Sequence, residues 1–537
     1  MTEEVEYLFL TGEGLDITQV HNVACESKKV KLSEEAKNKI KESREMLETW
    51  VDEEKIVYGI TTGFGPFVSV LIPKKHQTEL QENLIRSHSS NVGPLFSKEE
   101  VRAAMLLRIN AFCKGYSAIR LETVELMVDM LNNGVHPCVP QFGSVGASGD
   151  LTPSAHIALS IMGEGKTEYE GKILDTKEAL ELAGLKPVKF MAKEGLALIN
   201  GTTMMTGVGA LQVYDTWNLI RTAEAIGAMS IEVLFGSIEP FLVSAHQLAK
   251  PHPGQINTAY NLSAILKDSQ LIWTKEKLQK IQDNLQTKVK ENGEVVESKI
   301  HVQNVYSLRA TPQILGAVRD ALDYVTKQIT TEMNSANDNP LFFKDLDLVY
   351  QGAHFHGQPV AMPMDMLSIS LTEIAVLSER RLNKLLDRSR NEGLTPFLAG
   401  KDFGLRCGFE GAQYIPTALV AECRTMCVPA SIQSIPSNEE NQDVVSMGLV
   451  AARKARDIKE KIQYVLAVEL LVACSAAEER GVEKLSTVSK KVYSLLREEV
   501  QTYSQDRQMS LDIEKANKML QKNIFVKEIK KIIPDLK

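Results

Sequence analysis

The chain has 537 residues, of which 44% are hydrophobic and 24% charged, and its formal net charge at pH 7 is −8. A chain of this length can bury a large hydrophobic core, and its acidic balance argues against nucleic acid or a membrane surface as a partner. The seven cysteines are scattered, with no second Cys or His pair at the spacing of a metal site. We therefore expect reduced thiols, no bound metal and a cytoplasmic location.

Strand patterns are few and short, and they fall within the first 200 residues. They are YLFL at 7–10, KIVYGI at 55–60 and TEYEGKIL at 167–174, where Gly171 suggests a hairpin turn. We expect these stretches to form small sheets inside an N-terminal mixed domain at residues 1–200.

Helical periodicity dominates the rest of the chain. Apolar residues recur on one helical face between 315 and 333, and long patterns with few breakers run through 202–236, 360–389 and 450–481. The last of these is apolar around much of its circumference, which predicts burial among other helices of the same or another chain. We therefore expect a mainly α protein whose residues 201–537 form a bundle of long helices.

One loop stands out by its small residues. Residues 143–151 read GSVGASGDL, and an apolar, regular segment follows. Small side chains add no packing energy, and glycine disfavours both helix and strand. The stretch is either a plain loop before a helix capped by Asp150, or a place where the backbone itself reacts.

GSVGASGDLTPSAH at 143–156 resembles the signature of the ammonia-lyases and aminomutases that carry a 4-methylideneimidazol-5-one group, called MIO. In that family the glycine nitrogen attacks the alanine carbonyl, two waters leave, and the serine becomes an electrophilic methylidene. The resemblance implies that Ala147, Ser148 and Gly149 form MIO autocatalytically, and that no dissociable cofactor is needed. Glycine suits ring closure because it lets two backbone groups approach closely.

Six further stretches match the family in order, and together they cover nearly the whole chain. They are VYGITTGFG (57–65), ALINGT (197–202), VQNVYSLRATPQ (302–313), NDNPL (337–341), FHGQP (355–359) and ENQDVVSMG (440–448). The resemblance implies a fumarase/aspartase-like architecture, with a long central helical bundle and a smaller N-terminal domain that bears MIO. It also implies a homotetramer in which each active site draws on three subunits and the bundle forms the oligomer core.

The resemblance assigns catalytic roles to a few polar residues. Tyr58, on a mobile loop, would be the base, and Asn200 and Tyr306 would hydrogen-bond around the MIO carbonyl and the amine. Arg309 would grip the substrate carboxylate with its planar fork. Taken alone, Tyr58 would be read as a core residue, Asn200 as a turn residue and Arg309 as half of a surface ion pair.

The remaining substrate contacts are implied at His88, Phe355, Glu440 and Gln442. Histidine-specific members have a glutamate where this chain has Gln442, which disfavours an imidazole substrate. His88 can hydrogen-bond a para-hydroxyl group, which a phenyl ring would leave unpaired at a cost. Tyrosine is therefore the expected substrate, phenylalanine the second candidate and histidine the third. Ala353 and His354, in QGAHFHG, stand where many members have glycine and asparagine, so His354 either touches the substrate or belongs to the pocket wall.

The chemical outcome depends on how long the site stays closed. TGFGPFVSV (62–70) and SHSSNVGPL (87–95) look more like the family's bacterial aminomutases than its histidine degraders. We expect a tyrosine 2,3-aminomutase that converts L-tyrosine to β-tyrosine through p-coumarate. The alternatives, in order, are a tyrosine ammonia-lyase, a phenylalanine aminomutase or ammonia-lyase, and a histidine ammonia-lyase.

A different class shares the expected architecture. Fumarase- and aspartase-type lyases use no MIO, and a scaffold without catalytic activity would keep the same long helices. The intact Ala147-Ser148-Gly149 tripeptide and Tyr58 argue against both.

Overall fold

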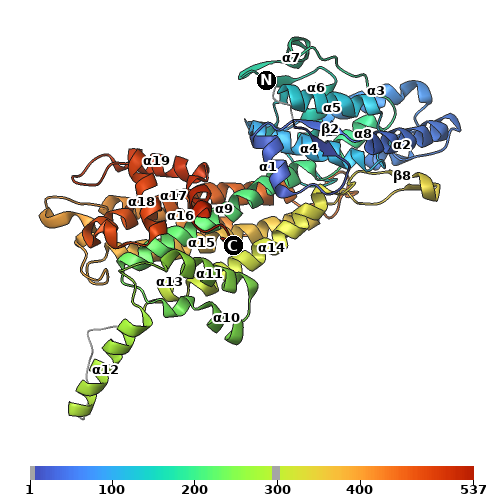
Figure 1. Cartoon of the computed structure of the whole chain (residues 1–537). Coiled ribbons are helices and arrows are strands. Elements are labelled where there is room, and N and C mark those ends of the chain that lie inside the picture. The colour runs from blue at the N-terminus through green and yellow to red at the C-terminus, as the bar shows by residue number, and fades with distance from the viewer. Residues whose placement is uncertain (1–5, 293–302) are drawn as a thin grey trace. The chain divides into compact units, whose positions relative to one another are not determined.

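The computed structural model describes residues 6–292 and 303–537, and it is mainly helical, as the sequence predicted (Figure 1). The chain forms two compact units, each built from three segments. Unit 1 comprises Met1–Tyr214, Tyr324–Met366 and Pro429–Arg456. Unit 2 comprises Asp215–Asp323, Leu367–Val428 and Asp457–Lys537.

Four long helices contribute residues to both units. They are α9 (Thr203–Val233), α14 (Thr311–Met333), α15 (Gln358–Leu386) and α17 (Gly448–Arg480), and they confirm the four long helical patterns of the sequence. Because each helix passes from one unit into the other, the units interleave along the chain. A single division into 1–200 and 201–537 stays a prediction.

Unit 1 holds the small sheets. β1 (Leu8–Leu10) pairs in parallel with β2 (Val30–Leu32), and β3 (Val92–Leu95) pairs antiparallel with β5 (Pro140–Phe142). The antiparallel sheet β4–β6–β7 combines His136–Pro137, Lys166–Tyr169 and Lys172–Asp175, and β8 (Leu341–Phe343) pairs with β9 (Leu348–Tyr350). The strand at 7–10 and the hairpin at 167–174 are therefore confirmed, with Gly171 at φ +76° in the turn.

The strand predicted at 55–60 is wrong. The amides of Ile60 and Thr61 both donate to the Val57 carbonyl, and Gly59 has a φ of +67°, so the segment is a turn. Val57 and Ile60 still face inward, where they pack in a core cluster with Leu47. The apolar residues of this stretch therefore reflect burial of a turn, a pattern that a short strand shares.

Among the helices of unit 1, α4 (Lys98–Cys113) is buried from Glu100 to Cys113. Ser97 and Glu100 form a capping box at its start, which satisfies two backbone amides. The others are α1 (Ile17–Cys25), α2 (Glu34–Asp52), α3 (Gln77–His88), α5 (Leu121–Asn133), α6 (Leu151–Ile161), α7 (Thr176–Leu182) and α8 (Glu194–Ile199).

Unit 2 is helical and carries two buried ion pairs between its long helices. Arg319 of α14 makes a bidentate contact with Glu224 of α9, with N–O distances of 2.8 and 2.9 Å. Arg381 of α15 contacts Glu469 of α17 in the same way, at 2.6 and 2.9 Å. The other helices are α10 (Val243–Ala249), α11 (Pro253–Leu266), α12 (Lys275–Asn292), α13 (Tyr306–Arg309), α16 (Glu410–Met426), α18 (Thr487–Glu499), α19 (Met509–Gln521) and α20 (Ile524–Ile532).

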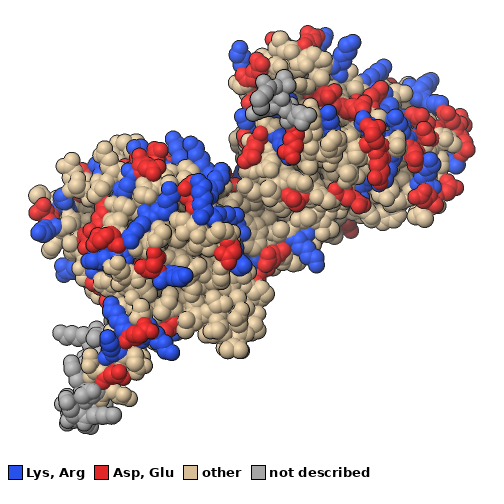
Figure 2. Space-filling model, viewed as in Figure 1, with Lys and Arg blue, Asp and Glu red and all other residues tan. Residues whose placement is uncertain are grey.

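The charges and the apolar helices are distributed as in a packed globular protein. Figure 2 shows acidic and basic side chains interspersed over the visible surface of each unit. Among the described residues, one helix, α15, is long and apolar enough to cross a membrane, and 72% of its most apolar window is buried. A core helix of a folded protein has these same properties.

Candidate active site

The tripeptide loop lies between β5 and α6, and its backbone is held against Gly201. The Gly201 amide donates to the Ser148 carbonyl at 2.9 Å, and the Asp150 amide donates to the Gly201 carbonyl at 2.7 Å. Gly149 has a φ of +72°, and a Cβ placed there would lie 2.0 Å from the Gly201 oxygen. Only glycine can occupy this position, because any side chain would collide with the backbone of Gly201.

Asn200 follows α8 and is 3% exposed. Its Nδ2 donates to the Asn339 carbonyl at 3.4 Å, whereas its Oδ1 has no hydrogen-bond partner within the described parts of the chain. A buried acceptor without a partner is unfavourable unless a ligand or water meets it. The side-chain-free Gly149 and this unpartnered amide oxygen fit an MIO group at the loop.

A cavity of about 360 Å³ in unit 1 brings several predicted residues together. This volume lies in the range typical of small-molecule sites. Ser148 and Asn200 line the cavity, and so do the predicted residues Tyr58, His88 and Gln442. Its apolar wall comes from Phe64, Pro66, Phe67, Leu80, Leu84, Leu151, Leu196 and Ile199.

A second cavity of about 270 Å³ touches the other side of the tripeptide. It is lined by Ala147 and Gly149, and it shares His88, Asn438 and Gln442 with the first cavity. Asn438 was not predicted, because nothing in the stretch SNEENQ distinguishes it from its polar neighbours. Its φ of +57° is a conformation that asparagine tolerates better than most residues.

Tyr58 sits in the turn at 57–62 and is half-buried. Its hydroxyl oxygen accepts a hydrogen bond from the Gly65 amide at 3.0 Å. A Cβ on Gly59, the next residue, would lie 2.6 Å from Leu196 Cδ2, so glycine lets this turn pack on α8. The turn and the glycine-rich loop therefore hold the phenol at the cavity wall.

His88 is the last residue of α3. Its Nδ1 lies 3.0 Å from the Leu84 carbonyl and 3.1 Å from Ser87 Oγ. Burial lowers the pKa of His88 below its ordinary value, although the Leu84 carbonyl opposes the shift. The ring is therefore neutral at pH 7, and donation from Nδ1 to Leu84 leaves Nε2 as an acceptor. His88 can then accept a hydrogen bond from a hydroxyl group in the cavity.

Asp150 follows the tripeptide and is fully buried. Its carboxylate accepts hydrogen bonds from the Met205 amide at 2.7 Å and from Ser144 Oγ at 3.4 Å. Burial raises the pKa of Asp150 to about 7, although the Met205 amide and the Arg108 charge oppose it. Near neutral pH this carboxyl group can therefore both accept and donate a proton.

The structure treats three other predicted residues differently: Gln442 lines both cavities, whereas Glu440 and Phe355 do not. Gln442 is held by Ser437, whose hydroxyl donates to Gln442 Oε1 at 3.1 Å. Glu440 is exposed at φ +61°, and it lines neither cavity. Phe355 is half-buried in the turn before α15 and also lines neither cavity.

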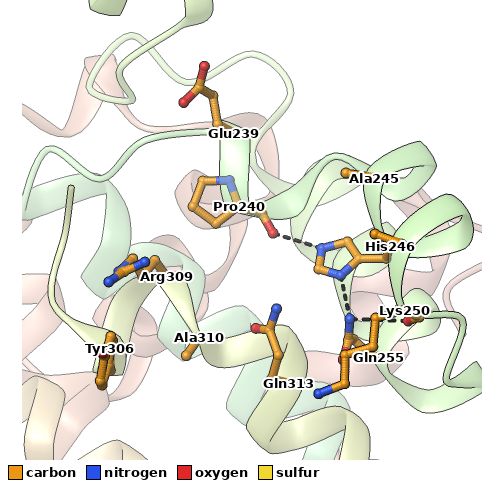
Figure 3. Close-up of a pocket in the computed structure, with 11 residues that line it drawn as sticks. Glu239, Pro240, Ala245, His246, Lys250, Gln255, Tyr306, Arg309, Ala310 and Gln313 are labelled. Atoms are coloured by element: carbon orange, nitrogen blue, oxygen red, sulfur yellow. Dashed lines mark hydrogen bonds between the residues drawn. The ribbon is translucent and has the colours of Figure 1, made fainter. Parts of the chain in front are cut away.

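Tyr306 and Arg309 lie on α13 in unit 2. They line a different cavity, of about 460 Å³, together with His246, Gln255 and Gln313 (Figure 3). Tyr306 is 70% exposed, and the Arg309 guanidinium carbon lies 4.8 Å from its ring centroid. Arg309 Nε is buried without a hydrogen-bond partner among the described residues. The structure thus gathers Tyr58, His88, Asn200 and Gln442 around the tripeptide in unit 1, and Tyr306 and Arg309 in unit 2.

The cavity beside α13 has a polar floor of its own. His246 Nε2 lies 2.8 Å from the Pro240 carbonyl, and its Nδ1 lies 2.7 Å from Gln255 Nε2. Figure 3 shows these two contacts opposite the Arg309 side chain. Since both ring nitrogens of His246 are engaged, this histidine has a structural role. Two cations, Arg309 and Lys250, line the cavity, and the planar fork of Arg309 is the one suited to a carboxylate.

Comparison with known proteins gives one consistent group. Residues 15–498 match the family described as aromatic amino acid lyase. A tyrosine ammonia-lyase of Cupriavidus metallidurans is 46% identical over 92% of this chain and 92% of its own. A histidine ammonia-lyase of Natranaerobius thermophilus is 42% identical over 99% and 100% of the two chains.

The MIO-dependent tyrosine 2,3-aminomutase of Streptomyces globisporus is 43% identical over 98% of this chain and 97% of its own. A crystal structure of tyrosine aminomutase from that organism superposes with a TM-score of 0.94, covering 98% of this chain and 99% of the other. The sequence comparison and the structure comparison therefore identify the same group of proteins.

Proposed function

Because this chain belongs to the aromatic amino acid lyase family, whose members are MIO-dependent ammonia-lyases and aminomutases, we propose that it is a tyrosine 2,3-aminomutase. The observation that carries the proposal is His88, a neutral hydrogen-bond acceptor on the wall of the cavity that Ser148 lines. A tyrosine hydroxyl would satisfy its Nε2, whereas a phenyl ring would leave that nitrogen unpaired. Gln442, in the same wall, lacks the charge that would favour an imidazole.

The cofactor of the proposal is MIO, formed from Ala147, Ser148 and Gly149 without metal. When formed, the ring supplies an electrophile that makes the substrate amine a good leaving group. Tyr58 removes the β-proton, and its hydrogen bond from Gly65 fixes the phenol oxygen for this step. Asn200 offers its unpartnered Oδ1 to the amine. Phe64 and Phe67 supply apolar wall beside the reacting atoms.

Migration rather than release is favoured by the loop that carries Phe64 and Phe67. Apolar residues 64–67 line the cavity, so a closed loop would keep the cinnamate-type acid in place until the amine returns to the β-carbon. The stretches at 62–70 and 87–95, similar to those of aminomutases, support the same choice. The second candidate is a tyrosine ammonia-lyase, since relatives with both names are similar to this chain to nearly the same degree.

The experiment is an incubation with L-tyrosine in which β-tyrosine and p-coumarate are both followed by chromatography with mass detection. We expect β-tyrosine to appear early and to exceed p-coumarate. Accumulation of p-coumarate alone would make the protein a lyase. Turnover of phenylalanine or histidine, with none of tyrosine, would overturn the role given to His88.

We also propose a homotetramer with shared active sites, in which Tyr306 and Arg309 of one subunit complete the tripeptide cavity of another. Support comes from the exposed Tyr306 ring and the unpartnered Arg309 Nε. Mixing a Tyr58→Phe variant with an Arg309→Gln variant should restore part of the activity after subunit exchange. Two inactive pools that stay inactive when mixed would contradict the sharing. The free cysteines support a cytoplasmic location, which fractionation of cells would test.

A further inference from the structure

Arg108 is a buried cation whose hydrogen bonds are incomplete. It lies on α4 and is 3% exposed. Its Nη1 donates to Asn337 Oδ1 at 3.4 Å, but its Nε and Nη2 have no partner in the described residues. Unpaired donors on a buried guanidinium are unfavourable, and a purely structural arginine would saturate them with carbonyl groups. Arg102, one turn and a half earlier on the same helix, does so with the carbonyls of Val23, Ala24 and Leu131.

A short chain of contacts links Arg108 to the tripeptide. Asn337 packs against Gly201, since a Cβ on this glycine would lie 2.4 Å from both the backbone oxygen and Oδ1 of Asn337. Gly201 in turn bonds to the carbonyl of Ser148 and to the amide of Asp150. The guanidinium is therefore separated from the reacting backbone by one amide side chain and one glycine.

Two carboxylates, Asp338 and Asp150, act on the charge of Arg108. The second nearby carboxylate, Asp338, is already paired, with Lys193 Nζ at 2.5 Å and Ser117 Oγ at 2.9 Å. The described hydrogen-bond partners of the Asp150 carboxylate are neutral, namely the Met205 amide and Ser144. Burial raises the pKa of Asp150, and the Met205 amide and the Arg108 charge oppose that shift. Burial also lowers the pKa of Arg108, to about 10, and the charges of Asp338 and Asp150 oppose that shift.

The other titratable groups near Arg108, Glu332 and Lys193, each have a hydrogen-bond or ion-pair partner. Glu332 contacts Thr202 and lies 3.5 Å from Asn337 Nδ2, and burial raises its pKa, while the charge of His354 opposes that shift. Burial lowers the pKa of Lys193, and Asp338 opposes it. With Lys193 committed to Asp338, Arg108 is the cation left to act on Asp150.

We propose that Arg108 is a positioning residue for MIO formation, and that its buried charge keeps the Asp150 carboxylate ionised to take the proton of the Gly149 amide. The inference rests on the proposed function, because it concerns the formation of that group. The Gly149 nitrogen bonds to the Ala147 carbonyl carbon, and its proton passes through Asp150 to the Ala147 oxygen. That oxygen leaves as water with the Ser148 amide proton, and a second water takes the Ser148 hydroxyl and its Cα hydrogen. Protons and electrons balance without an oxidant.

The test measures maturation itself. Full-length chain is made by cell-free translation, exchanged into buffers from pH 6 to 9, and followed by intact mass, since ring formation removes two waters, about 36 Da. The variants are Arg108→Gln, which removes the charge, and Arg108→Lys, which keeps it. Arg102→Gln is the matched control, because it also removes a buried arginine from α4.

We expect Arg108→Gln to mature about tenfold more slowly than wild type at pH 7, and the midpoint of its pH profile to rise by about one unit. Arg108→Lys should recover most of the rate, and Arg102→Gln should keep the wild-type midpoint. A wild-type rate and midpoint for Arg108→Gln would overturn the inference. Slowing by the same factor at every pH, or equal slowing in both glutamine variants, would reduce Arg108 to a structural role and also overturn it.

Asn337→Asp tests the same inference if Arg108→Gln does not fold. It keeps the arginine but gives it a carboxylate partner, so the charge felt by Asp150 falls and the midpoint should rise in the same direction. An unchanged or lowered midpoint in Asn337→Asp would contradict the inference. Wild-type chain that never loses the two waters would instead overturn the proposed function, and this inference with it.

Discussion

The cavity at the tripeptide and the cavity beside α13 hold their residues in different ways. At the tripeptide, Gly149, Asp150 and Asn200 are almost completely buried, and the backbone contacts of the loop within the described residues come from unit 1. Beside α13, Tyr306 is 70% exposed and Arg309 has a buried nitrogen without a partner among the described residues. The proposed backbone reaction therefore concerns residues of unit 1, whereas the substrate-binding groups proposed on α13 belong to unit 2. Maturation and turnover should therefore respond to different substitutions.

The largest effect should come from Gly149→Ala. The added Cβ would lie 2.0 Å from the Gly201 oxygen, at a φ of +72°, so the loop cannot keep its contacts with Gly201. We expect no loss of the two waters, as measured by intact mass, and activity at least a thousandfold lower. Gly171→Ala is the control, because Gly171 has a φ of +76° but open space around it. Equal loss of activity in both variants would mean that backbone strain, and not the contact with Gly201, is responsible.

Arg309→Gln should lower turnover without affecting ring formation at the tripeptide. If Arg309 binds the substrate carboxylate, its removal lowers kcat/KM for tyrosine by about a hundredfold or more, because a bidentate charged contact is lost. The intact mass should still show the loss of two waters, since unit 1 carries that reaction. Lys250→Gln, in the wall of the same cavity, is the control and should change kcat/KM less than threefold. If Arg309→Gln failed to lose the two waters, ring formation would also depend on α13, and the two cavities would not act independently.

The sequence predicted some of the residues that line the tripeptide cavity and missed others. Motif resemblance located Tyr58, the tripeptide, Asn200 and Gln442, and the structure brings them to one cavity because the spacing of the motifs reflects a shared fold. It could not show that Asn438 lines both cavities, or that Glu440 lines neither, since the φ values of 54–61° across residues 438–440 decide which side chain points inward.

The sequence also predicted the long helices correctly but not the short segment at 55–60. The long helices followed from periodicity, which depends on burial of one face along many turns. The segment at 55–60 has apolar residues but too few for a period to be read, and tertiary packing made it a turn. Arg108 carries no sequence signal either, because its effect depends on Asp338 being paired with Lys193, a residue 145 positions away.

His88→Leu tests the choice of substrate within the tripeptide cavity. Loss of the acceptor should lower kcat/KM for tyrosine by about ten- to fiftyfold and raise that for phenylalanine, because the apolar wall then extends to the ring end. In wild type, burial lowers the pKa of His88, so the neutral acceptor is present at pH 7 and is lost as the pH falls below that lowered value. KM for tyrosine should therefore rise at acidic pH in wild type but not in His88→Leu.

The control for that experiment is His76→Leu. His76 precedes α3, is half-exposed and contacts Glu79, outside either cavity. It should leave the tyrosine-to-phenylalanine ratio unchanged. A His88→Leu variant with the wild-type ratio would place the ring end of the substrate elsewhere in the cavity.

The smallest expected effect concerns Glu232, a buried carboxyl group whose pKa is raised to about the same value as that of Asp150. Burial raises the pKa of Glu232, in unit 2, to about 7, the value that Asp150 reaches beside the tripeptide. Folded Glu232 thus holds a proton that the unfolded chain releases above about pH 4.5, so its contribution is fully present below that pH and is lost as the pH rises through 7. Glu232→Gln removes this dependence while its oxygen can still accept from the Ser486 amide.

Relative to wild type, Glu232→Gln should gain on the order of 1–3 kcal/mol of stability between pH 4.5 and 8, measured by thermal unfolding, with the mass loss and the activity unchanged. Glu498→Gln, exposed on α18, should show no such pH-dependent gain. A Glu232→Gln curve parallel to wild type would mean that the carboxylate is solvated on ionisation.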